Sequence, residues 1–488
     1  MGSESTADQK WMVPPANHAN GLLGEGQTSS QQVRRQGIGL LLVGAATFGL
    51  GVWGLWRDVV WIAEPFYGYA WWGYIIALDG FVAWKTGNSL LTSRRRHLLP
   101  LLIWSCTFWY IFELLNLRFQ NWYYVGAFRT LWAGYAFSLI AFSTVLIGMF
   151  ETFEAVTATG LWRNWRGKDR KFSGWVSYAV QGLGLAMAGA AILFPYYLAP
   201  LIWGSLSFLI DPWNYRRGAR SILHDFEVGD FGLVARLLFA GLICGGVWES
   251  MNFAAPQKWI YTVRGLESLK LFEMPLLGFL GFPALALDGM AFYSMLSYKF
   301  LGNQSWENPR NLRYSLVPKP TPPKRFFLAS IPLQIIFGAL VLIGVRQVNI
   351  ASAKVELEDL RTLSTEEIQV LESVGITRPI RLYREGRSDD RAEGLRTILG
   401  VDATKYGQII DEVALYVFKG IGAWHGFLLR EAGISRIEDL ARWRPEDLYE
   451  AMKPVSDLHD IRMPRLDMVR VWILAARDRG VVMNGNSH

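Results

Sequence analysis

The chain has 488 residues, of which 51% are hydrophobic, 19% are charged and 22 are tryptophan. So small a share of charged residues is untypical of a water-soluble protein of this length and indicates a membrane protein. The two cysteines, Cys106 and Cys244, lie inside apolar segments, so a disulfide-stabilised extracellular scaffold is excluded.

Apolar residues gather in runs of about 18 to 25 residues, long enough as helices to cross a hydrocarbon core of roughly 30 Å. They predict an all-α protein, a polytopic bundle of about nine transmembrane helices. The polar residues 1–36 precede them as a flexible tail without a signal peptide. The predicted spans are 37–56, 66–84, 98–117, 131–151, 175–194, 196–211, 232–252, 275–298 and 326–346.

Basic residues alternate between the two sides of this bundle. The loops on the side of the N-terminus contain 18 Lys and Arg, and the opposite loops contain 6. By the positive-inside rule the N-terminus is cytoplasmic, and an odd number of spans leaves the C-terminal domain outside, as expected in a bacterial inner membrane. Residues 351–488 carry 20 Lys and Arg against 23 Asp and Glu, so the basic surplus belongs to the membrane part and does not predict nucleic-acid binding.

An internal repeat is visible in the membrane part. Each half has a Trp-Gly pair with an aspartate following, then a Glu-x-x-Asn pattern, then Trp-x-Tyr. Two landmarks in the same order predict two parallel four-helix units, 37–156 and 175–302, with 326–346 as a ninth helix, and ligand sites in such bundles tend to lie between the units. The matched residues are Trp72, Asp79, Glu113, Asn116, Trp122 and Tyr124 in the first unit, and Trp203, Asp211, Glu249, Asn252, Trp259 and Tyr261 in the second.

Carboxyl groups inside apolar spans are expensive, so each requires a reason. Glu113 with Asn116, and Glu249 with Asn252, are three residues apart and share a helix face. Both pairs are predicted near the outer ends of their helices, where Glu273 begins the eighth span, so the three acids are candidates for one polar cavity.

The alternative is that these acids sit hydrated at the headgroup level within an ordinary belt of Trp and Tyr. Asp288 lies deeper and is harder to explain without a partner, whereas Asp79 and Asp211 lie near the cytoplasmic ends, where capping and snorkelling are the simpler roles. No paired D-x-x-x-D pattern, Walker motif or histidine-rich cluster is present, so no metal and no cofactor are expected.

The order W-E-x-x-N, W-x-Y and Phe272-Glu273-Met274-Pro275 in the second unit resembles the small-repeat integral-membrane lycopene cyclases over about 60 residues. Glu273 stands alone where that family has two adjacent acids, and Ala133 occupies the matching place in the first unit. The resemblance implies protonation of a polyene double bond by a carboxylic acid, with Glu249 and Glu273, and by repetition Glu113, as catalytic candidates. The aromatic and amide residues, with Asp288, would then contact the isoprenoid or lipid-like ligand.

Residues 351–488 form a predicted soluble helical domain. Phe418-Lys419-Gly420-Ile421-Gly422, with the leucine-rich and Arg-Pro-Glu-Asp segments that follow, resembles an uncharacterised bacterial family of helix-hairpin-helix domains over about 360–480. In nucleic-acid binders of this type, glycines such as Gly420 and Gly422, on either side of Ile421, let backbone N–H groups approach a phosphate. Because this domain is net acidic, protein–protein or self-association is favoured over DNA.

Three classes of function remain open from the sequence. The first is a membrane enzyme or binder acting on a lipophilic molecule, with an outer-leaflet carboxylate and aromatic site. The second is a membrane-anchored scaffold that presents the C-terminal domain to a protein partner. The third is a proton-linked transporter that uses the intramembrane carboxylates.

Overall fold

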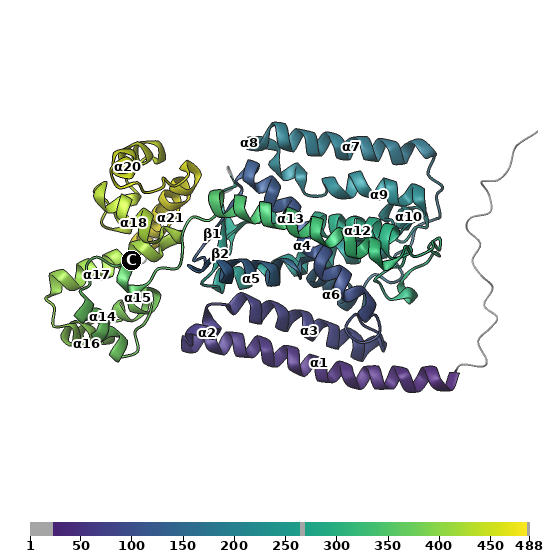
Figure 1. The fold of residues 1–488 in the computed structure, drawn as a ribbon, viewed down its shortest axis with the longest axis horizontal. Helices are drawn as coiled ribbons and strands as arrows, with labels where there is room; N and C mark the ends of the chain where they lie inside the picture. The colour runs from purple at the N-terminus through teal and green to yellow at the C-terminus, as the bar shows by residue number, and fades with distance from the viewer. Residues whose placement is uncertain (1–22, 264–268, 486–488) are drawn as a thin grey trace, which may run out of the picture.

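The computed structural model describes residues 23–263 and 269–485, so the first part of the predicted tail, 1–22, lies outside the described residues. The chain is mostly helical, with a helical bundle and a C-terminal domain at one end of it (Figure 1). The bundle contains α1 (Leu23–Arg57), α2 (Val60–Ala63), α3 (Phe66–Thr86), α4 (Leu98–Phe119), α5 (Leu131–Phe142), α6 (Val145–Ala158), α7 (Gly174–Leu193), α8 (Pro195–Leu198), α9 (Ser205–Arg217), α10 (Ile222–Glu227), α11 (Phe231–Ala254), α12 (Gly281–Phe300) and α13 (Lys324–Val348).

Helices that match in the two halves of the sequence pack in matching ways. Helix α1 packs along α3 and α7 packs along α9, while α6 contacts α3 and α4 as α12 contacts α9 and α11. Small residues allow the closest of these approaches, since a Cβ added at Gly44 of α1 would lie 2.3 Å from the backbone N of Ala77 in α3. Helix α13 lies against α4.

Seven helical segments of the described chain are long and apolar enough to cross a membrane. They coincide with seven of the nine predicted spans. The other two differ for local reasons: α3 is rich in Trp, Tyr and Gly, which lower its hydropathy, and the segment predicted at 196–211 is divided into α8, a 3-10 turn (η2, Ala199–Ile202) and α9. The seven segments are Ser30–Arg57, Arg95–Phe119, Leu131–Ala158, Gly174–Leu193, Phe231–Ala254, Leu276–Phe300 and Lys324–Val348.

The predicted span 131–151 is also interrupted. Helix α5 ends at Phe142 and α6 begins at Val145. The hydroxyl of Ser105, from α4, donates to the carbonyl of Phe142 at 2.6 Å and accepts from the backbone N–H of Leu146 at 3.1 Å. A neighbouring helix therefore satisfies backbone groups that the interruption frees, as an apolar setting requires.

The end of the bundle beside the C-terminal domain contains a small antiparallel ribbon. It is formed by β1 (Trp122–Val125) and β2 (Lys258–Tyr261), and a second hairpin, β3 (Lys270–Leu271) with β4 (Met274–Pro275), leads into the 3-10 helix η3 (Leu276–Leu280). Trp122 lies opposite Tyr261 and Tyr124 opposite Trp259. The basic loops meet at the other end, where Gly167 bonds to Gly229 and Val317 to Gly218.

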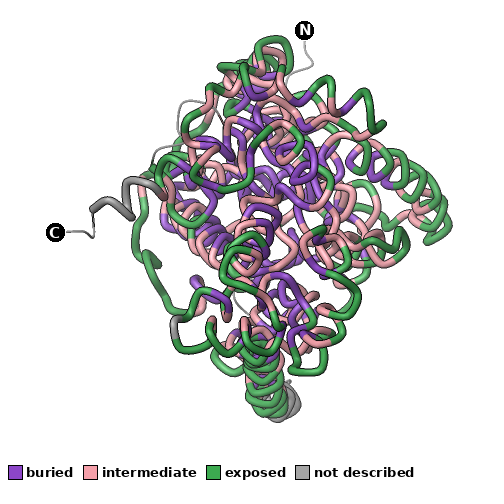
Figure 2. Tube along the Cα trace, turned by 90° about the vertical axis from the view of Figure 1, so that its left-hand side faces the viewer, coloured by how far each residue is buried: buried purple, intermediate pink, exposed green. Residues whose placement is uncertain are grey.

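The C-terminal domain has its own hydrophobic core, separate from that of the bundle. Buried residues lie in the middle of the molecule and exposed ones around it (Figure 2). The domain consists of η5 (Leu357–Asp359), α14 (Thr365–Ser373), α15 (Pro379–Gly386), α16 (Asp389–Leu399), α17 (Ala403–Val417), η6 (Phe418–Gly420), α18 (Gly422–Glu431), α19 (Ile437–Leu440), α20 (Pro445–His459) and α21 (Leu466–Gly485); the remaining short helices, η1 (Arg95–His97) and η4 (Pro309–Asn311), belong to the bundle.

Candidate functional site

The β1–β2 ribbon has two different faces. Successive side chains of a strand point to opposite sides. Trp122, Tyr124, Trp259 and Tyr261 pack against the core of the bundle, whereas Tyr123, Val125 and Ile260 belong to the core of the C-terminal domain. The ribbon therefore stands as a wall that the two cores share.

The two glutamates of the repeat hold the aromatic side chains of this wall. Oε1 of Glu113 accepts from the indole N–H of Trp122 at 3.3 Å and from the hydroxyl of Tyr124. In the second half, Oε1 of Glu249 accepts from the indole of Trp259 at 3.3 Å and from the hydroxyl of Tyr261 at 2.8 Å. The predicted Glu and Trp-x-Tyr residues are thus brought together in each half.

The two asparagines attach the strands to the helix ends. The amide of Asn116 donates to the carbonyl of Trp122 at 3.0 Å, and the amide of Asn252 donates to the carbonyl of Trp259 at 3.0 Å. Each side-chain oxygen also accepts a backbone N–H at the start of its strand. The Glu-x-x-Asn pattern therefore holds the Trp-x-Tyr segment beside the helix. The amide of Asn binds the backbone of the strand, and the carboxyl of Glu binds the Trp and Tyr side chains.

The other oxygen of each carboxyl is different. Oε2 of Glu113 and Oε2 of Glu249 are buried and have no hydrogen-bond partner among the described residues. Both side chains are fully buried, and neither forms an ion pair in the described part of the chain. Each site has therefore one oxygen saturated by ring donors and one left open.

The aromatic face of the ribbon borders a cavity of about 520 Å³. Helix α5 lines one side of it, and η3 with the start of α12 lines the other. The ring centroid of Trp248 lies 5.4 Å from those of both Trp71 and Trp109, so the two halves of the bundle meet through tryptophans here. The aromatic lining includes Tyr67, Trp71, Trp109, Trp122, Tyr124, Tyr135, Phe137, Trp203, Trp248, Trp259 and Tyr261.

The predicted site residues fall into two groups around this cavity. Trp122, Tyr124, Trp259 and Tyr261 line it. The carboxyls of Glu113 and Glu249 and the amides of Asn116 and Asn252 do not; they support the rings that do. The three acids were expected to face one cavity, but none of them lines it. Aromatic rings lie between the cavity and the carboxyl groups of Glu113 and Glu249.

Glu273 has another partner. It lies in the turn between β3 and β4, and both of its carboxylate oxygens accept from Nζ of Lys419, at 3.0 and 2.8 Å. Nζ of Lys258 is 3.8 Å from the same carboxylate. Glu273 therefore joins the bundle to the turn between α17 and α18 instead of pairing with Glu249.

Asp288 caps a helix. Its carboxylate accepts the backbone N–H of Gly204 at 2.8 Å and of Ser207 at 2.6 Å, at the start of α9. An acidic side chain is favourable at a helix N-terminus. The free backbone N–H groups at the start of α9 therefore explain why an aspartate lies within this apolar segment.

Asp79 and Asp211 accept matching hydrogen bonds in the two halves. Asp79 accepts from the hydroxyl of Ser89 and the N–H of Leu91, and Asp211 from the hydroxyl of Ser221 and the N–H of Ile222, at 2.8 to 2.9 Å. Asp211 therefore caps α10, whereas Asp79 makes the matching contacts to a turn at residues 90–93, and both side chains are buried and do not extend to the surface.

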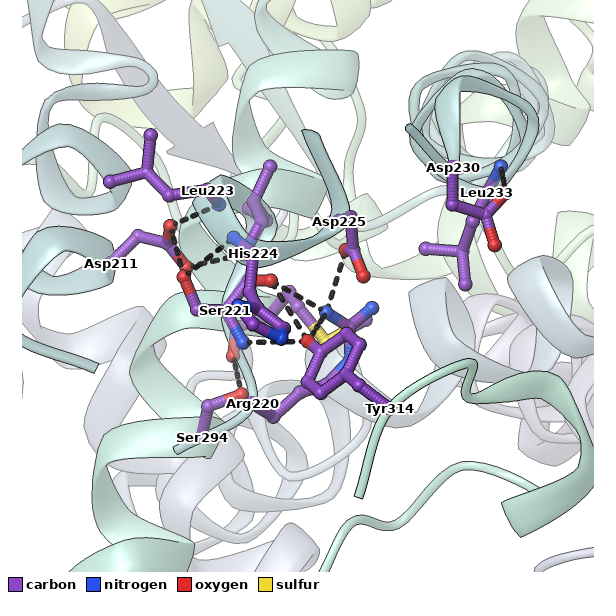
Figure 3. A network of polar contacts seen from close by, with 12 residues as sticks. Asp211, Arg220, Ser221, Leu223, His224, Asp225, Asp230, Leu233, Ser294 and Tyr314 are labelled. Atoms are coloured by element: carbon purple, nitrogen blue, oxygen red, sulfur yellow. Dashed lines mark hydrogen bonds and ion pairs between the residues drawn. The ribbon is translucent and has the colours of Figure 1, made fainter. Parts of the chain in front are cut away.

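A buried ion network at the other end of the bundle was missed from the sequence. Arg220 pairs with Asp225 at 2.6 Å and donates to the hydroxyl of Tyr314 at 2.9 Å (Figure 3). It also pairs with Glu307 at 2.8 Å. Burial raises the pKa of Asp225 to about 7, although Arg220 acts in the opposite direction. In the sequence, the arginines of these loops indicate only the orientation of the bundle. Their ion pairs with Asp225 and Glu307 become visible once the loops are folded.

The predicted hairpin residues Gly420, Ile421 and Gly422 lie between α17 and α18. Gly420 has φ of +75° and Gly422 has φ of +69°, a conformation that favours glycine. A Cβ at Gly420 would lie 2.0 Å from Cγ1 of Val125, and one at Gly422 would lie 2.5 Å from Cβ of Ser352. The glycines thus allow the turn to contact the bundle's own ribbon and the segment that follows α13.

Comparison with known proteins identifies one region. Residues 361–479 match a family model described as a domain of unknown function, DUF4332. This agrees with the expectation of an uncharacterised domain at the C-terminus. No curated protein and no solved structure matches the chain.

Proposed function

We propose that this chain is a multi-pass membrane protein that binds a lipophilic molecule in the aromatic cavity between its two halves. The cavity carries the proposal: its volume is within the roughly 300–1,000 Å³ typical of small-molecule sites, and its lining is mainly aromatic and aliphatic. The matching sequence landmarks and hydrogen bonds of the halves support a duplication, with the cavity where ligand sites of duplicated bundles tend to lie.

Membrane embedding is supported by the outer helices. In each of the apolar segments Ser30–Arg57, Gly174–Leu193 and Lys324–Val348, only 17% of the residues in an apolar stretch of 18 are buried within the protein. Leu42, Leu185 and Leu333 are more than 60% exposed, which is unfavourable in water and natural in lipid. With the basic loops at the opposite end, the positive-inside rule predicts that the cavity and the C-terminal domain lie on the outer side.

Access from the membrane is supported by the cavity's own lining. Leu131 at the start of α5 and Leu277 and Leu280 in η3 line the cavity and are also exposed on the outside. No residue of α5 is buried, although this helix covers one side of the cavity. A lipophilic molecule could thus enter sideways between α5 and η3 without crossing water.

Binding is favoured over acid catalysis. Protonation of a polyene needs a carboxyl within hydrogen-bond reach of the ligand. The oxygen that Glu113 and Glu249 direct toward the wall is occupied by ring donors, and Glu273 is occupied by Lys419. The carboxyls are therefore assigned the role of positioning the aromatic rings.

A scaffold role is the second candidate, because the C-terminal domain shares a core with the ribbon. The turn at Gly420 and Gly422 already contacts Val125 and Ser352, so its helix-hairpin-helix-like surface has an intramolecular occupant. That arrangement does not favour phosphate binding at this turn. A protein partner of the domain would use another face.

Bromine quenches tryptophan fluorescence on contact, so methyl dibromostearate in detergent solution provides a neutral probe of the cavity. We expect saturable quenching that unbrominated methyl stearate reverses. Gly134 lines the cavity and a Cβ there meets nothing within 4 Å, so Gly134→Leu should fill the cavity and remove the saturable part. Gly189→Leu, on α7 and equally unobstructed, is the control. Equal quenching in both variants would refute cavity binding.

A further inference from the structure

The charged residues that line the cavity have one sign. Within the described residues, Lys258 and Arg346 are the charged lining groups, and no carboxylate lines the cavity. A site for a purely hydrocarbon molecule gains nothing from a cation, because desolvating a charge is costly. The lining therefore has an excess of positive charge, and of its two cations only Lys258 has a carboxylate within ion-pair distance among the described residues.

Arg346 is the freer of the two cations. It lies in the last turn of α13, is exposed, and has neither an ion pair nor a hydrogen bond to any described residue. Three residues later, the carbonyl of Asn349 accepts from the N–H of Tyr124 at 2.8 Å. Arg346 is therefore beside the same ribbon that closes the cavity.

Lys258 belongs to the ribbon itself, as the first residue of β2. It pairs with Val125 in the β1–β2 ladder, while Ile350, after α13, bridges to Tyr124. Its ammonium group donates to the carbonyl of Phe253 at 3.1 Å and is 3.8 Å from Glu273, whose carboxylate is bound by Lys419. Burial lowers the pKa of Lys258 because it disfavours the charged ammonium form. An anionic group nearby would stabilise that charged form and would itself be stabilised by it.

The cavity lining also contains an uncharged hydrogen-bond donor. Gln257 lines the cavity, and its side-chain Nε2 is buried without a hydrogen-bond partner among the described residues. A buried donor without an acceptor is unfavourable, so this amide can gain an acceptor from a ligand. The cavity thus combines an apolar aromatic body with two cations and an unsatisfied amide donor.

We propose that the ligand is an amphiphile with an anionic head group, a carboxylate or a phosphate, bound by Arg346 with Lys258 and Gln257 beside it, and with its hydrocarbon part among the tryptophans. This inference rests on the proposed function and names the chemical class of its ligand. A basic residue at a membrane interface can also simply extend its charge into the headgroup region. The experiment must separate these two roles.

The test uses dibromostearic acid, a dibrominated alkyl phosphate and methyl dibromostearate with the full-length protein at pH 8, where both acids are ionised. We expect either anionic probe to bind roughly tenfold tighter than the ester, as one charge-assisted hydrogen bond implies. Arg346→Gln should remove that advantage and leave ester binding unchanged. Arg118→Gln is the matched control, since Arg118 is exposed in the last turn of α4 and does not line the cavity.

The outcomes are distinguishable. If the ester and both anions bind equally, or if Arg118→Gln weakens anion binding as much as Arg346→Gln, the anionic head group is refuted while cavity binding stands. If no probe gives saturable quenching, the proposed function itself fails. A loss confined to the anions and to Arg346→Gln supports the inference.

Discussion

Lys419 donates to both carboxylate oxygens of Glu273, at 3.0 and 2.8 Å, and so joins a turn of the C-terminal domain to the bundle. Glu273 is 2% exposed, so this ion pair replaces the contacts with water that its carboxylate has lost. The β1–β2 ribbon lies beside this pair, with one face in each core. Occupation of the cavity and docking of the domain therefore involve the same strands.

Glu273→Gln should weaken docking of the domain. The substitution removes the counter-ion of Lys419, which is 28% exposed and so remains partly hydrated, and the lost charge-assisted hydrogen bonds cost on the order of 2 kcal/mol. We expect faster amide hydrogen exchange at Ala351 and Lys354, whose N–H groups bond to Tyr124 and Ala127 of the bundle. Glu385→Gln, which breaks a pair with Arg381 inside the domain, is the control and should leave these amides protected.

Substitutions at Glu249 should separate positioning from catalysis. Glutamine keeps an oxygen that can accept from Trp259 and Tyr261, so Glu249→Gln should retain most probe binding, whereas Glu249→Ala should lower it roughly tenfold by releasing the rings. The quenching titration measures both. Loss of binding or turnover in the glutamine variant, with alanine no worse, would favour a role for the acidic proton instead. Glu113 should behave in the same way.

The sequence was informative where function is carried by residues close in the chain. Glu249, Asn252, Trp259 and Tyr261 lie within 13 positions and were singled out as one pattern, but their hydrogen bonds to one another follow from the helix-to-strand geometry. The repeated pattern at Glu113 makes the same contacts in the first half.

Partners from distant segments could not be predicted in that way. Glu273 and Lys419 are 146 positions apart, and Arg220 and Glu307 are 87 apart. The interruption between α5 and α6 contains neither proline nor glycine and depends on Ser105 of another helix. In each case the deciding group becomes visible only when the helices are packed.

The side of the membrane can be read from a C-terminal fusion. If the basic loops are cytoplasmic, as the positive-inside rule predicts, the domain should lie outside. A fluorescent protein that folds only in the cytosol should therefore stay dark when fused after residue 488, and an alkaline phosphatase that needs the periplasm should be active. A bright fluorescent fusion would reverse the orientation and move the cavity to the inner leaflet.

His425 should make the C-terminal domain sensitive to acid. It is 4% exposed, its Nδ1 is unpartnered among the described residues, and burial lowers its pKa to about 4. Because the folded-state pKa lies below the unfolded value of about 6.5, the stabilisation is complete above pH 6.5 and is lost as the pH falls toward 4, by on the order of 3 kcal/mol. Denaturant unfolding followed between pH 7 and 4 should be less pH-dependent in His425→Gln. An unchanged slope would assign the acid sensitivity to other groups.

Gly420→Ala should undock the domain, and Gly400→Ala should not. Both glycines have positive φ, +75° and +66°, so alanine at either position incurs a similar backbone strain of about 1 kcal/mol. A Cβ at Gly420 would also lie 2.0 Å from Cγ1 of Val125, whereas a Cβ at Gly400 meets nothing within 4 Å.

The difference between these two variants therefore isolates the contact between the turn and the ribbon. We expect faster hydrogen exchange at Ala351 and Lys354 in Gly420→Ala only, because separation of the turn exposes the strands it covers. Val125→Gly removes both obstructing atoms, Cγ1 at 2.0 Å and Cβ at 2.6 Å, and in combination with Gly420→Ala it should restore part of the protection. If Gly400→Ala exchanges as fast as Gly420→Ala, strain within the domain explains the effect, and the turn does not hold the domain to the bundle.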